Sequence, residues 1–249
     1  MITRTTHLEK PPKIRKDLLK YFYPNDSLII FDIGSCEGED SYRYARLFPN
    51  ATIYAFEPLP GNFLRIENLI RDKNLGSRIH AFSYALSNHS GKARFHMSSG
   101  APPGKDTSDW DYGNKSSSLY PPGKTREVHK WLEFNESIEV DTLTLKQFCA
   151  EQAINHIDFI HMDVQGAELD VLKGAGDLID NISMIWMEVH SVPLYADQPL
   201  KDEVEGFMAA HHFSIIKDTV DDTAGDQLYV KNTLGKRPLI SRLRALIDS

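Results

Sequence analysis

Short runs of hydrophobic and β-branched residues alternate along the chain with stretches in which hydrophobic residues recur at helical spacing. The runs predict strands at residues 28–31, 51–56, 78–86, 157–162 and 183–189. The helical spacing predicts helices over about residues 13–23, 39–48, 63–70, 145–152, 167–172 and 200–211. Runs that are apolar on both faces are typical of strands buried in a parallel sheet, and their alternation with helices indicates an α/β fold.

Two further strands are predicted near the end of the chain, at residues 213–218 and 227–230. The turn between them, at residues 220–225, is long enough for a hairpin but too short for a crossover helix. The sheet should therefore end in an antiparallel pair. We predict a single doubly wound domain over residues 1–249, with a mostly parallel seven-stranded sheet and a terminal antiparallel hairpin.

The regular alternation breaks in the middle of the chain, where residues 98–124 are rich in Gly, Pro, Ser and Asp and show no period. Short strands are predicted on either side, at residues 92–97 and 137–140. The region 98–131 also carries four large aromatic residues: Trp110, Tyr112, Tyr120 and Trp131. A long irregular insertion in a compact domain is typical of a lid or binding loop, and aromatic side chains suit sugar rings. The alternative is a surface insertion without a role at the site.

The C-terminal tail, about residues 232–249, combines a connector with a short basic amphipathic stretch. Leu239, Leu243, Leu246 and Ile247 share one face of a helix, with Arg242 and Arg244 off it. We interpret this stretch as a packing or homo-oligomer helix, because a membrane-surface helix is normally longer or more basic.

Composition narrows the class of protein. The chain is 41% hydrophobic and 25% charged, as in an ordinary globular protein, and its net charge of −7 disfavours a nucleic-acid binder. No apolar run approaches the ~20 residues of a membrane span, and no secretory signal is visible at the N-terminus. Two cysteines are too few for a disulfide framework, so we expect a cytoplasmic enzyme acting on a small molecule.

A nucleotide-like site is predicted at the carboxyl ends of the first two strands. The loop Asp32-Ile33-Gly34-Ser35-Cys36-Glu37-Gly38 joins the first strand to its helix, and Gly34 and Gly38 permit close approach of a ligand. Glu57 ends the second strand, 23 residues after Gly34, where a carboxylate can accept hydrogen bonds from both ribose hydroxyls.

Two cofactors compete for this site, a nicotinamide dinucleotide and S-adenosylmethionine. Glu39 and Asp40 would repel a pyrophosphate, whereas they suit a positively charged sulfonium. The terminal antiparallel pair also fits the methyltransferase variant of the doubly wound sheet. S-adenosylmethionine is therefore favoured, with a nicotinamide-dependent oxidoreductase or a catalytically silent nucleotide-binding module as the alternatives.

Five motifs sharpen this prediction. They are Asp32 to Gly38, Phe56-Glu57-Pro58, Ser116 to Leu119, Asp163 to Glu168 and Glu188-Val189-His190. In this order they resemble the FkbM-type methyltransferases, over roughly residues 28–232. The resemblance implies a class I, Rossmann-like O-methyltransferase that uses S-adenosylmethionine and acts on a sugar or natural-product hydroxyl. It implies cofactor contacts from the loop, which includes Asp32, Gly34, Ser35 and Gly38, from Glu57, and from the segment 83–87, where Ser83 and Ala85 would face the adenine.

The sequence departs from the pattern of the family at three positions. Cys36 stands where Asn is usual, His161 where Lys is common, and Gln165 where Glu is usual. The last two change the charge beside the expected reaction site, so the family's preferred acceptor does not carry over.

Candidate catalytic residues follow the fourth and fifth strands. A hydroxyl acceptor must lose its proton, so we expect His190 or Asp163 to act as the base, with Glu188 orienting its partner. Strand alternation places Glu188 and His190 on one side. Glu168 is expected to be structural, and Asp163 could instead cap the following helix. A Mg²⁺ ion held by Asp163, Glu188 and His190 is the less favoured alternative.

Overall fold

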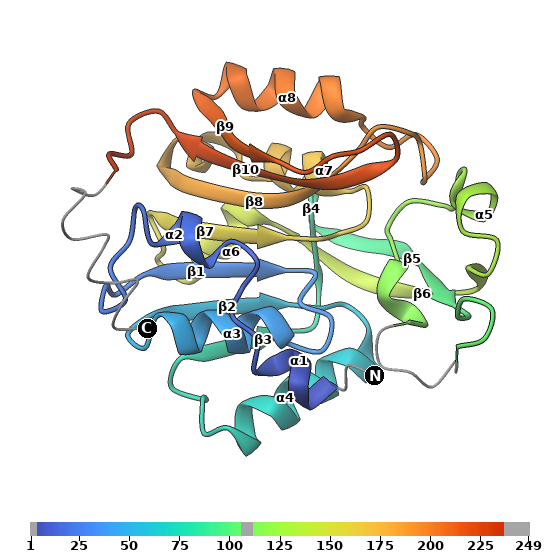
Figure 1. Cartoon of the computed structure of the whole chain (residues 1–249), viewed down its shortest axis with the longest axis horizontal. Coiled ribbons are helices and arrows are strands. Elements are labelled where there is room, and N and C mark those ends of the chain that lie inside the picture. Colours follow the sequence, from blue (N-terminus) through green and yellow to red (C-terminus); the bar gives the residue numbers. More distant parts are fainter. Residues whose placement is uncertain (1–3, 106–111, 237–249) are drawn as a thin grey trace.

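A computed structural model describes residues 4–105 and 112–236, and its centre is a seven-stranded sheet (Figure 1). The strand order is β3-β2-β1-β7-β8-β10-β9, and only β10 runs antiparallel to its neighbours. The strands are β1 (Ile29–Ile33), β2 (Thr52–Phe56), β3 (Ile79–Phe82), β7 (Ile157–Met162), β8 (Ile182–His190), β9 (Phe213–Asp218) and β10 (Ala224–Lys231). The predicted doubly wound, mostly parallel sheet with a terminal antiparallel hairpin is confirmed.

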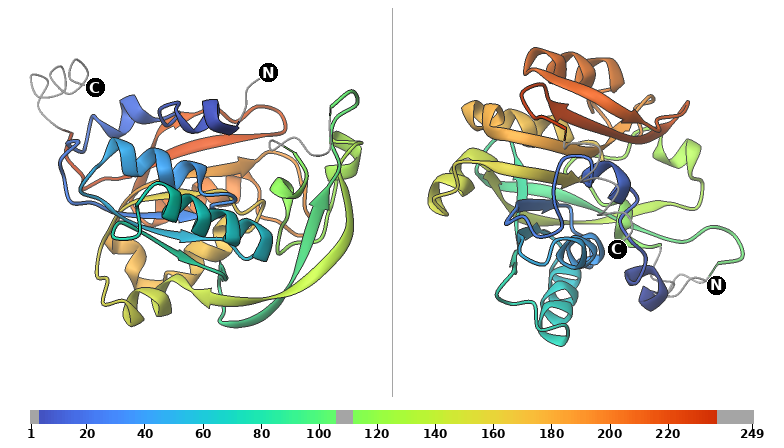
Figure 2. Two further views of the ribbon diagram at one scale, coloured as in Figure 1. Left: turned by 90° about the horizontal axis from the view of Figure 1, so that it is seen from below. Right: turned by 60° about the vertical axis from the view of Figure 1, so that its left-hand side comes forward.

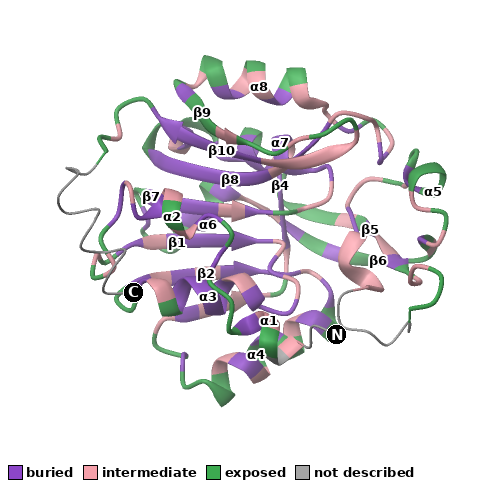
Figure 3. Cartoon of the chain, viewed as in Figure 1, coloured by how far each residue is buried: buried purple, intermediate pink, exposed green. Residues whose placement is uncertain are grey.

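Helices cover both faces of this sheet and enclose two hydrophobic cores. One core lies under α6 (Leu145–Glu151), α7 (Glu168–Gly174) and α8 (Lys201–Ala210), next to the 3₁₀ turn η2 (Gly176–Asn181). The other lies under α3 (Glu39–Leu47) and α4 (Pro60–Asp72), together with the N-terminal segment. The strands between them are largely buried (Figure 3), as continuous apolar runs predict.

The predicted N-terminal helix over residues 13–23 is wrong. The segment forms only α2 (Arg15–Leu18), and a separate helix, α1 (Arg4–Leu8), precedes it. Beyond Leu18 the chain continues in turns with bonds such as Lys20 N–H to Asp17 O, so the helix does not extend. Its apolar residues are nevertheless buried as predicted, because Tyr21 and Phe22 reach the core from these turns. Packing of the side chains decided the structure here, and helical spacing alone did not.

A second sheet, which the sequence did not predict as such, lies beside the carboxyl ends of the central strands (Figures 1 and 2). Its order is β4-β6-β5, from β4 (Ala85–Ser87), β6 (Glu133–Thr144) and β5 (Gly91–Ser99). The predicted strand 78–86 is therefore two strands, β3 and β4, in different sheets. Because β3 is an edge strand, the chain can leave the main sheet there. Leu59, Ala85, Phe95 and Val140 form a small core at the join.

The insertion at residues 98–131 contains short ordered elements where it is described. These are the 3₁₀ turn η1 (Asn114–Ser116) and α5 (Thr125–Val128), with isolated bridges from Ser118 to His96 and from Pro122 to Tyr195. Trp110 and the predicted helix after residue 238 lie outside the described residues. Over residues 4–105 and 112–236, no helix has the length and apolar character that crossing a membrane requires.

Candidate active site

The loop after β1 and the loop after β7 touch through Gly34. Its φ is +80°, and a Cβ placed there would lie 1.9 Å from the Asp163 backbone oxygen, so no other residue fits. The N–H groups of Gly34 and Ser35 both donate to the Phe56 carbonyl, at 3.0 and 2.9 Å. Gly38, with φ +82°, then starts α3. The carboxyl ends of β1, β2 and β7 are thereby held together at one point.

Glu57 is buried at the end of β2 and is held by the backbone. Its Oε2 accepts the Cys36 N–H and its Oε1 accepts the Leu59 N–H, both at 2.9 Å. Burial raises the pKa of this carboxyl to about 8, although the two backbone hydrogen bonds act in the opposite direction. Each oxygen keeps a second lone pair, so the carboxyl can still accept hydrogen bonds from a ligand.

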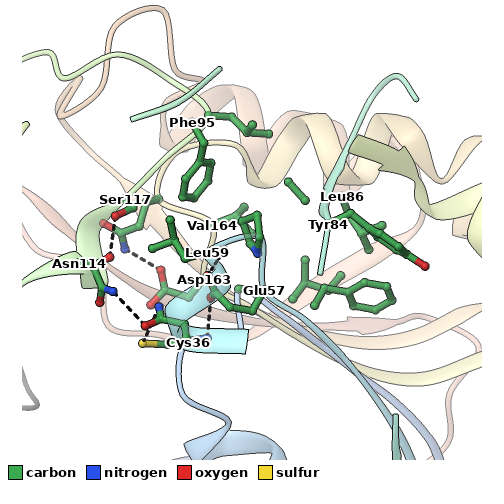
Figure 4. A pocket seen from close by; sticks show the side chains of 18 of the residues that line it. Cys36, Glu57, Leu59, Tyr84, Leu86, Phe95, Asn114, Ser117, Asp163 and Val164 are labelled. Atoms are coloured by element: carbon green, nitrogen blue, oxygen red, sulfur yellow. Dashed lines mark hydrogen bonds between the residues drawn. The ribbon is translucent and has the colours of Figure 1, made fainter. Parts of the chain in front are cut away.

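A first cavity opens above Glu57 and is largely apolar (Figure 4). Its empty space, part of which is open to solvent, amounts to about 540 Å³. Its apolar walls come from both sheets and the insertion: Leu59, Tyr84, Leu86, Phe95, Leu119 and Val164. Of the segment predicted to face adenine, residues 84–86 including Ala85 line this cavity. Ser83 is exposed and does not line it.

A second cavity, of about 1010 Å³ and also open to solvent, is polar. Asp32 and Ser35 line it from the β1 loop, and the other lining groups include Lys13, Asp40, Arg43, His161 and Asp226. Asp32 is buried and accepts a hydrogen bond from Ser41, and burial raises its pKa to about 6 against the opposing effect of His161. Four residues line both cavities: Gly34, Cys36, Lys115 and Asp163. They mark the junction between the two.

Gln165 connects the carboxyl groups that follow β7 and β8. Its amide Nε2 donates to Asp163 Oδ1 at 2.6 Å and to Glu188 Oε2 at 2.7 Å. Its Oε1 accepts the Tyr195 hydroxyl at 2.6 Å, and its backbone oxygen accepts the Ser118 hydroxyl. The residue has φ +55°, a conformation that is costly for a non-glycine side chain. Gln165 stands where the family usually has Glu, but nothing in the sequence points to Tyr195 as its partner.

Asp163 lies at this junction and is accessible from it. The surrounding protein raises its pKa by desolvation, and the charge of Asp226 adds to this effect. Asp163 does not cap α7, whose N-cap residue makes no side-chain hydrogen bond. Glu168, the first residue of α7, instead holds the loop before the helix: its two oxygens accept the N–H groups of Val164 and Gly166, each at 3.0 Å. This fits the structural role expected for Glu168.

Asp163, Glu168 and Glu188 bring carboxyl oxygens within 4.8 Å of one another, which makes them a candidate cation site. Protein donors already engage each of them. Backbone N–H groups hold both oxygens of Glu168, and the Gln165 amide bridges Asp163 and Glu188. The cluster differs from the set predicted for Mg²⁺ in one member, because Glu168 and not His190 lies beside Asp163 and Glu188.

Glu188 and His190 lie on the same side of β8, as strand alternation predicts, with His190 Nε2 3.4 Å from Glu188 Oε2. His190 is 2% exposed and lines neither cavity. Burial lowers the pKa of His190 to about 4 and raises that of Glu188, whose increase the charge of Asp163 reinforces. The His190 imidazole is therefore uncharged near neutral pH. His190 lies where it can support Glu188, but it does not face either cavity.

Replacing His190 with glutamine is expected to remove a pH dependence of stability. Below the ordinary histidine pKa of 6.5 the unfolded chain binds a proton, while the folded protein resists it until about pH 4. Above pH 6.5 the protonation of His190 therefore costs the folded protein no stability. Between pH 6.5 and pH 4 the free energy of unfolding falls by up to about 3 kcal/mol because of this residue. Urea unfolding at several pH values measures it, with exposed His89→Gln as the control. Parallel pH curves for the wild type and His190→Gln would contradict this assignment.

The aromatic residues expected to bind a sugar are engaged elsewhere. Tyr112 packs edge-on against Trp131, and the Tyr120 hydroxyl donates to Asp170 at 2.9 Å. None of the three lines either cavity. The insertion instead supplies Asn114, Lys115, Ser117 and Leu119 to the first cavity. The Ser116 to Leu119 motif had indicated that this part of the insertion belongs to the site, but it did not include Lys115.

Several solved structures resemble this fold. A putative rRNA methylase from Clostridium thermocellum has a TM-score of 0.49 at 9% identity, covering 88% of this chain and 94% of that one. TrmK of M. capricolum, solved with S-adenosylhomocysteine, has a TM-score of 0.47 at 11% identity, covering 94% of this chain and 75% of that one.

Sequence relatives are closer. The 2-O-methyltransferase NoeI of Sinorhizobium fredii is 32% identical over 192 residues, which are 76% of this chain and 74% of that protein. Methyltransferase 1 of Beauveria bassiana is 28% identical over 166 residues, 64% of each chain. The family model described as the methyltransferase FkbM domain matches residues 32–215. The chain therefore belongs to the FkbM family of S-adenosylmethionine-dependent methyltransferases.

Proposed function

We propose that this protein transfers a methyl group from S-adenosylmethionine to a hydroxyl of a small, polar molecule such as a sugar, with Asp163 as the general base. The observation that carries the proposal is the place of Asp163. Among the candidate catalytic residues, it alone lines both cavities, at their junction. Glu188 and His190 line neither.

The two cavities together fit the cofactor. The apolar walls of the first suit an adenine, and Glu57 is aimed at the same space, where ribose hydroxyls would donate to its carboxyl. The polar second cavity suits the charged amino-acid end, with Asp32 among the groups available to an ammonium. When bound there, the cofactor supplies a methyl group made electrophilic by the sulfonium.

The role of Asp163 follows from its surroundings. A general base works best when its pKa approaches the working pH, and desolvation moves the pKa of Asp163 in that direction. The Gln165 amide fixes one carboxyl oxygen, Oδ1, which leaves Oδ2 to accept a proton from an acceptor hydroxyl. Orienting the base in this way supplies part of the rate acceleration before any bond changes.

The second cavity also favours a hydroxyl-rich acceptor. Its lining includes hydrogen-bond acceptors and donors, among them Asp40, Asp226, Lys13 and His161. A ligand with many hydroxyl groups can satisfy such a lining, whereas an apolar one would leave it unpaired. The name of the relative NoeI, a 2-O-methyltransferase, supports an oxygen acceptor as well.

The test is transfer of an isotope-labelled methyl group from S-adenosylmethionine to a panel of sugars and phenols, with and without EDTA. We expect label in sugar hydroxyls and unchanged turnover after EDTA. Calorimetry should detect binding of S-adenosylhomocysteine and none of NAD. Label confined to nitrogen or carbon atoms of an acceptor, or complete loss of turnover with EDTA, would overturn the proposed chemistry.

A further inference from the structure

Lys115 reaches the cofactor site from the insertion, far along the chain from the β1 loop. Its Nζ lies 3.3 Å from Cys36 Sγ and 3.6 Å from Glu39 Oε1. The Lys115 side chain is 24% exposed and lines both cavities, whereas the Glu39 side chain is 7% exposed. That Glu39 oxygen has no hydrogen-bond partner among the described residues. A charged ammonium and a buried carboxyl oxygen without a hydrogen bond therefore face each other at the junction of the cavities.

The backbone on both sides of Lys115 is held in place. The Asn114 side-chain amide donates to Asn62 Oδ1 on α4 at 2.9 Å. The Tyr195 hydroxyl, whose single hydrogen is shared between Gln165 Oε1 and the Ser116 carbonyl, lies 2.8 Å from that carbonyl. The Ser116 N–H donates to Ser98 Oγ at 3.0 Å. Contacts to three separate parts of the chain therefore fix η1 over the site. Lys115 is a positioned part of the cavity wall.

The charge on Lys115 is maintained despite its position. Burial disfavours the ammonium, but Cys36 and Glu39 favour it, and the net effect raises the pKa of Lys115. The Cys36 Sγ acts by accepting a hydrogen bond from the ammonium, at 3.3 Å. The site therefore presents a cation at the point where a ligand would pass from the apolar cavity to the polar one.

Other cations in the second cavity are placed less well to meet a ligand carboxylate there. Arg43 donates to Asp40 and to the His7 carbonyl, at 3.0 and 2.9 Å. The Lys13 side chain is 81% exposed, with its Nζ 3.7 Å from Asp226. Neither residue lines the first cavity. Among the lining residues of the described chain, Lys115 is the cation that both cavities share.

We propose that Lys115 binds the α-carboxylate of the amino-acid end of S-adenosylmethionine, so that the insertion completes the cofactor site. This inference rests on the proposed function, which places the adenosine in the first cavity. The amino-acid end must then cross the junction, where Lys115 meets its carboxylate while Asp32, in the second cavity, is available to its ammonium. A charge-assisted hydrogen bond of this kind changes affinity by about 10- to 100-fold.

The test compares S-adenosylmethionine with its decarboxylated form, which lacks only the carboxylate, by calorimetry. The wild type is expected to bind the decarboxylated ligand about 10- to 100-fold more weakly. Lys115→Met should weaken binding of S-adenosylmethionine by a similar factor and leave the decarboxylated ligand within about threefold, so that the preference disappears. Lys124→Met, the same change at an exposed lysine of the insertion, should keep the preference.

Each outcome decides one question. Equal affinity of the wild type for both ligands overturns the inference without any variant, and so does a preference that survives in Lys115→Met. Equal weakening of both ligands in Lys115→Met would assign Lys115 to the shape of the cavity and would also overturn it. If the wild type bound neither ligand, the proposed function itself would fail.

Discussion

Replacing Asp163 with asparagine is expected to lower kcat for methyl transfer by about 10²- to 10⁴-fold, the usual contribution of a general base. The amide keeps the size of the side chain but cannot take the acceptor proton. Affinity for S-adenosylhomocysteine should change only a few-fold, because the cofactor loop and Glu57 stay in place. Single-turnover transfer of labelled methyl groups, combined with calorimetry, separates the two effects.

The pH profile provides a second signature of Asp163. The titratable groups that face it come from several elements: Lys13 before α2, His161 on β7, Glu168 on α7, Glu188 on β8 and Asp226 on β10. Because a base must be ionised, wild-type kcat should rise with pH through the raised pKa of Asp163. The variant should lose this limb, and exposed Asp72→Asn should retain it. An unchanged kcat in Asp163→Asn would move the base elsewhere.

Replacing Glu57 with alanine should weaken binding of S-adenosylhomocysteine by about 100-fold or more. The change removes two charge-assisted hydrogen bonds to the ribose, each worth about 1.5–3 kcal/mol. It also leaves the N–H groups of Cys36 and Leu59 without their acceptor, so the β1 loop loses support. Calorimetry measures the affinity, and circular dichroism checks that the variant is folded.

Binding to Glu57 should also depend on pH. With a pKa of about 8, the carboxyl of the free protein is mostly protonated at pH 7, and ribose hydroxyls bind best to its ionised form. Affinity should therefore rise between pH 6 and 8, by at most about tenfold per pH unit, and level off above. The matched variant Glu57→Gln should bind more weakly and show a flatter profile. Alanine at this position with wild-type affinity would disprove the ribose assignment.

The strands and most helices were predictable because the main sheet is built from local signals. Strands buried between two helix layers appear in any such sequence as continuous apolar runs. The hairpin at residues 220–225 could be predicted from the length of its turn alone. The predicted helix over residues 13–23 was wrong because hydrophobic residues at helical spacing can be buried without a continuous helix. The prediction of one strand over residues 78–86 was wrong because the second half of this segment pairs with residues 142–144, and the local sequence does not reveal that partner.

The candidate site divides in the same way. Glu57 follows β2 and Asp163 follows β7, the two parallel strands that flank β1, so both lie at the same edge of the sheet and their proximity follows from topology. The burial of His190 and the exposure of Ser83 depend on how the surrounding segments pack. Lys115 lies 79 residues from Cys36 along the chain, and its arrival at the site depends on the path of the whole insertion. No spacing rule covers contacts of that kind.

The departure of the chain from the main sheet between β3 and β4 has an evolutionary consequence. From Ala85 to Thr144 the polypeptide leaves the scaffold and returns to it, carrying Phe95, Lys115 and Leu119 as one wall of the site. Glu57 and Asp163 lie outside that excursion. This single stretch can therefore be remodelled to suit another acceptor without displacing the proposed ribose ligand and base, as long as a cation stays at position 115.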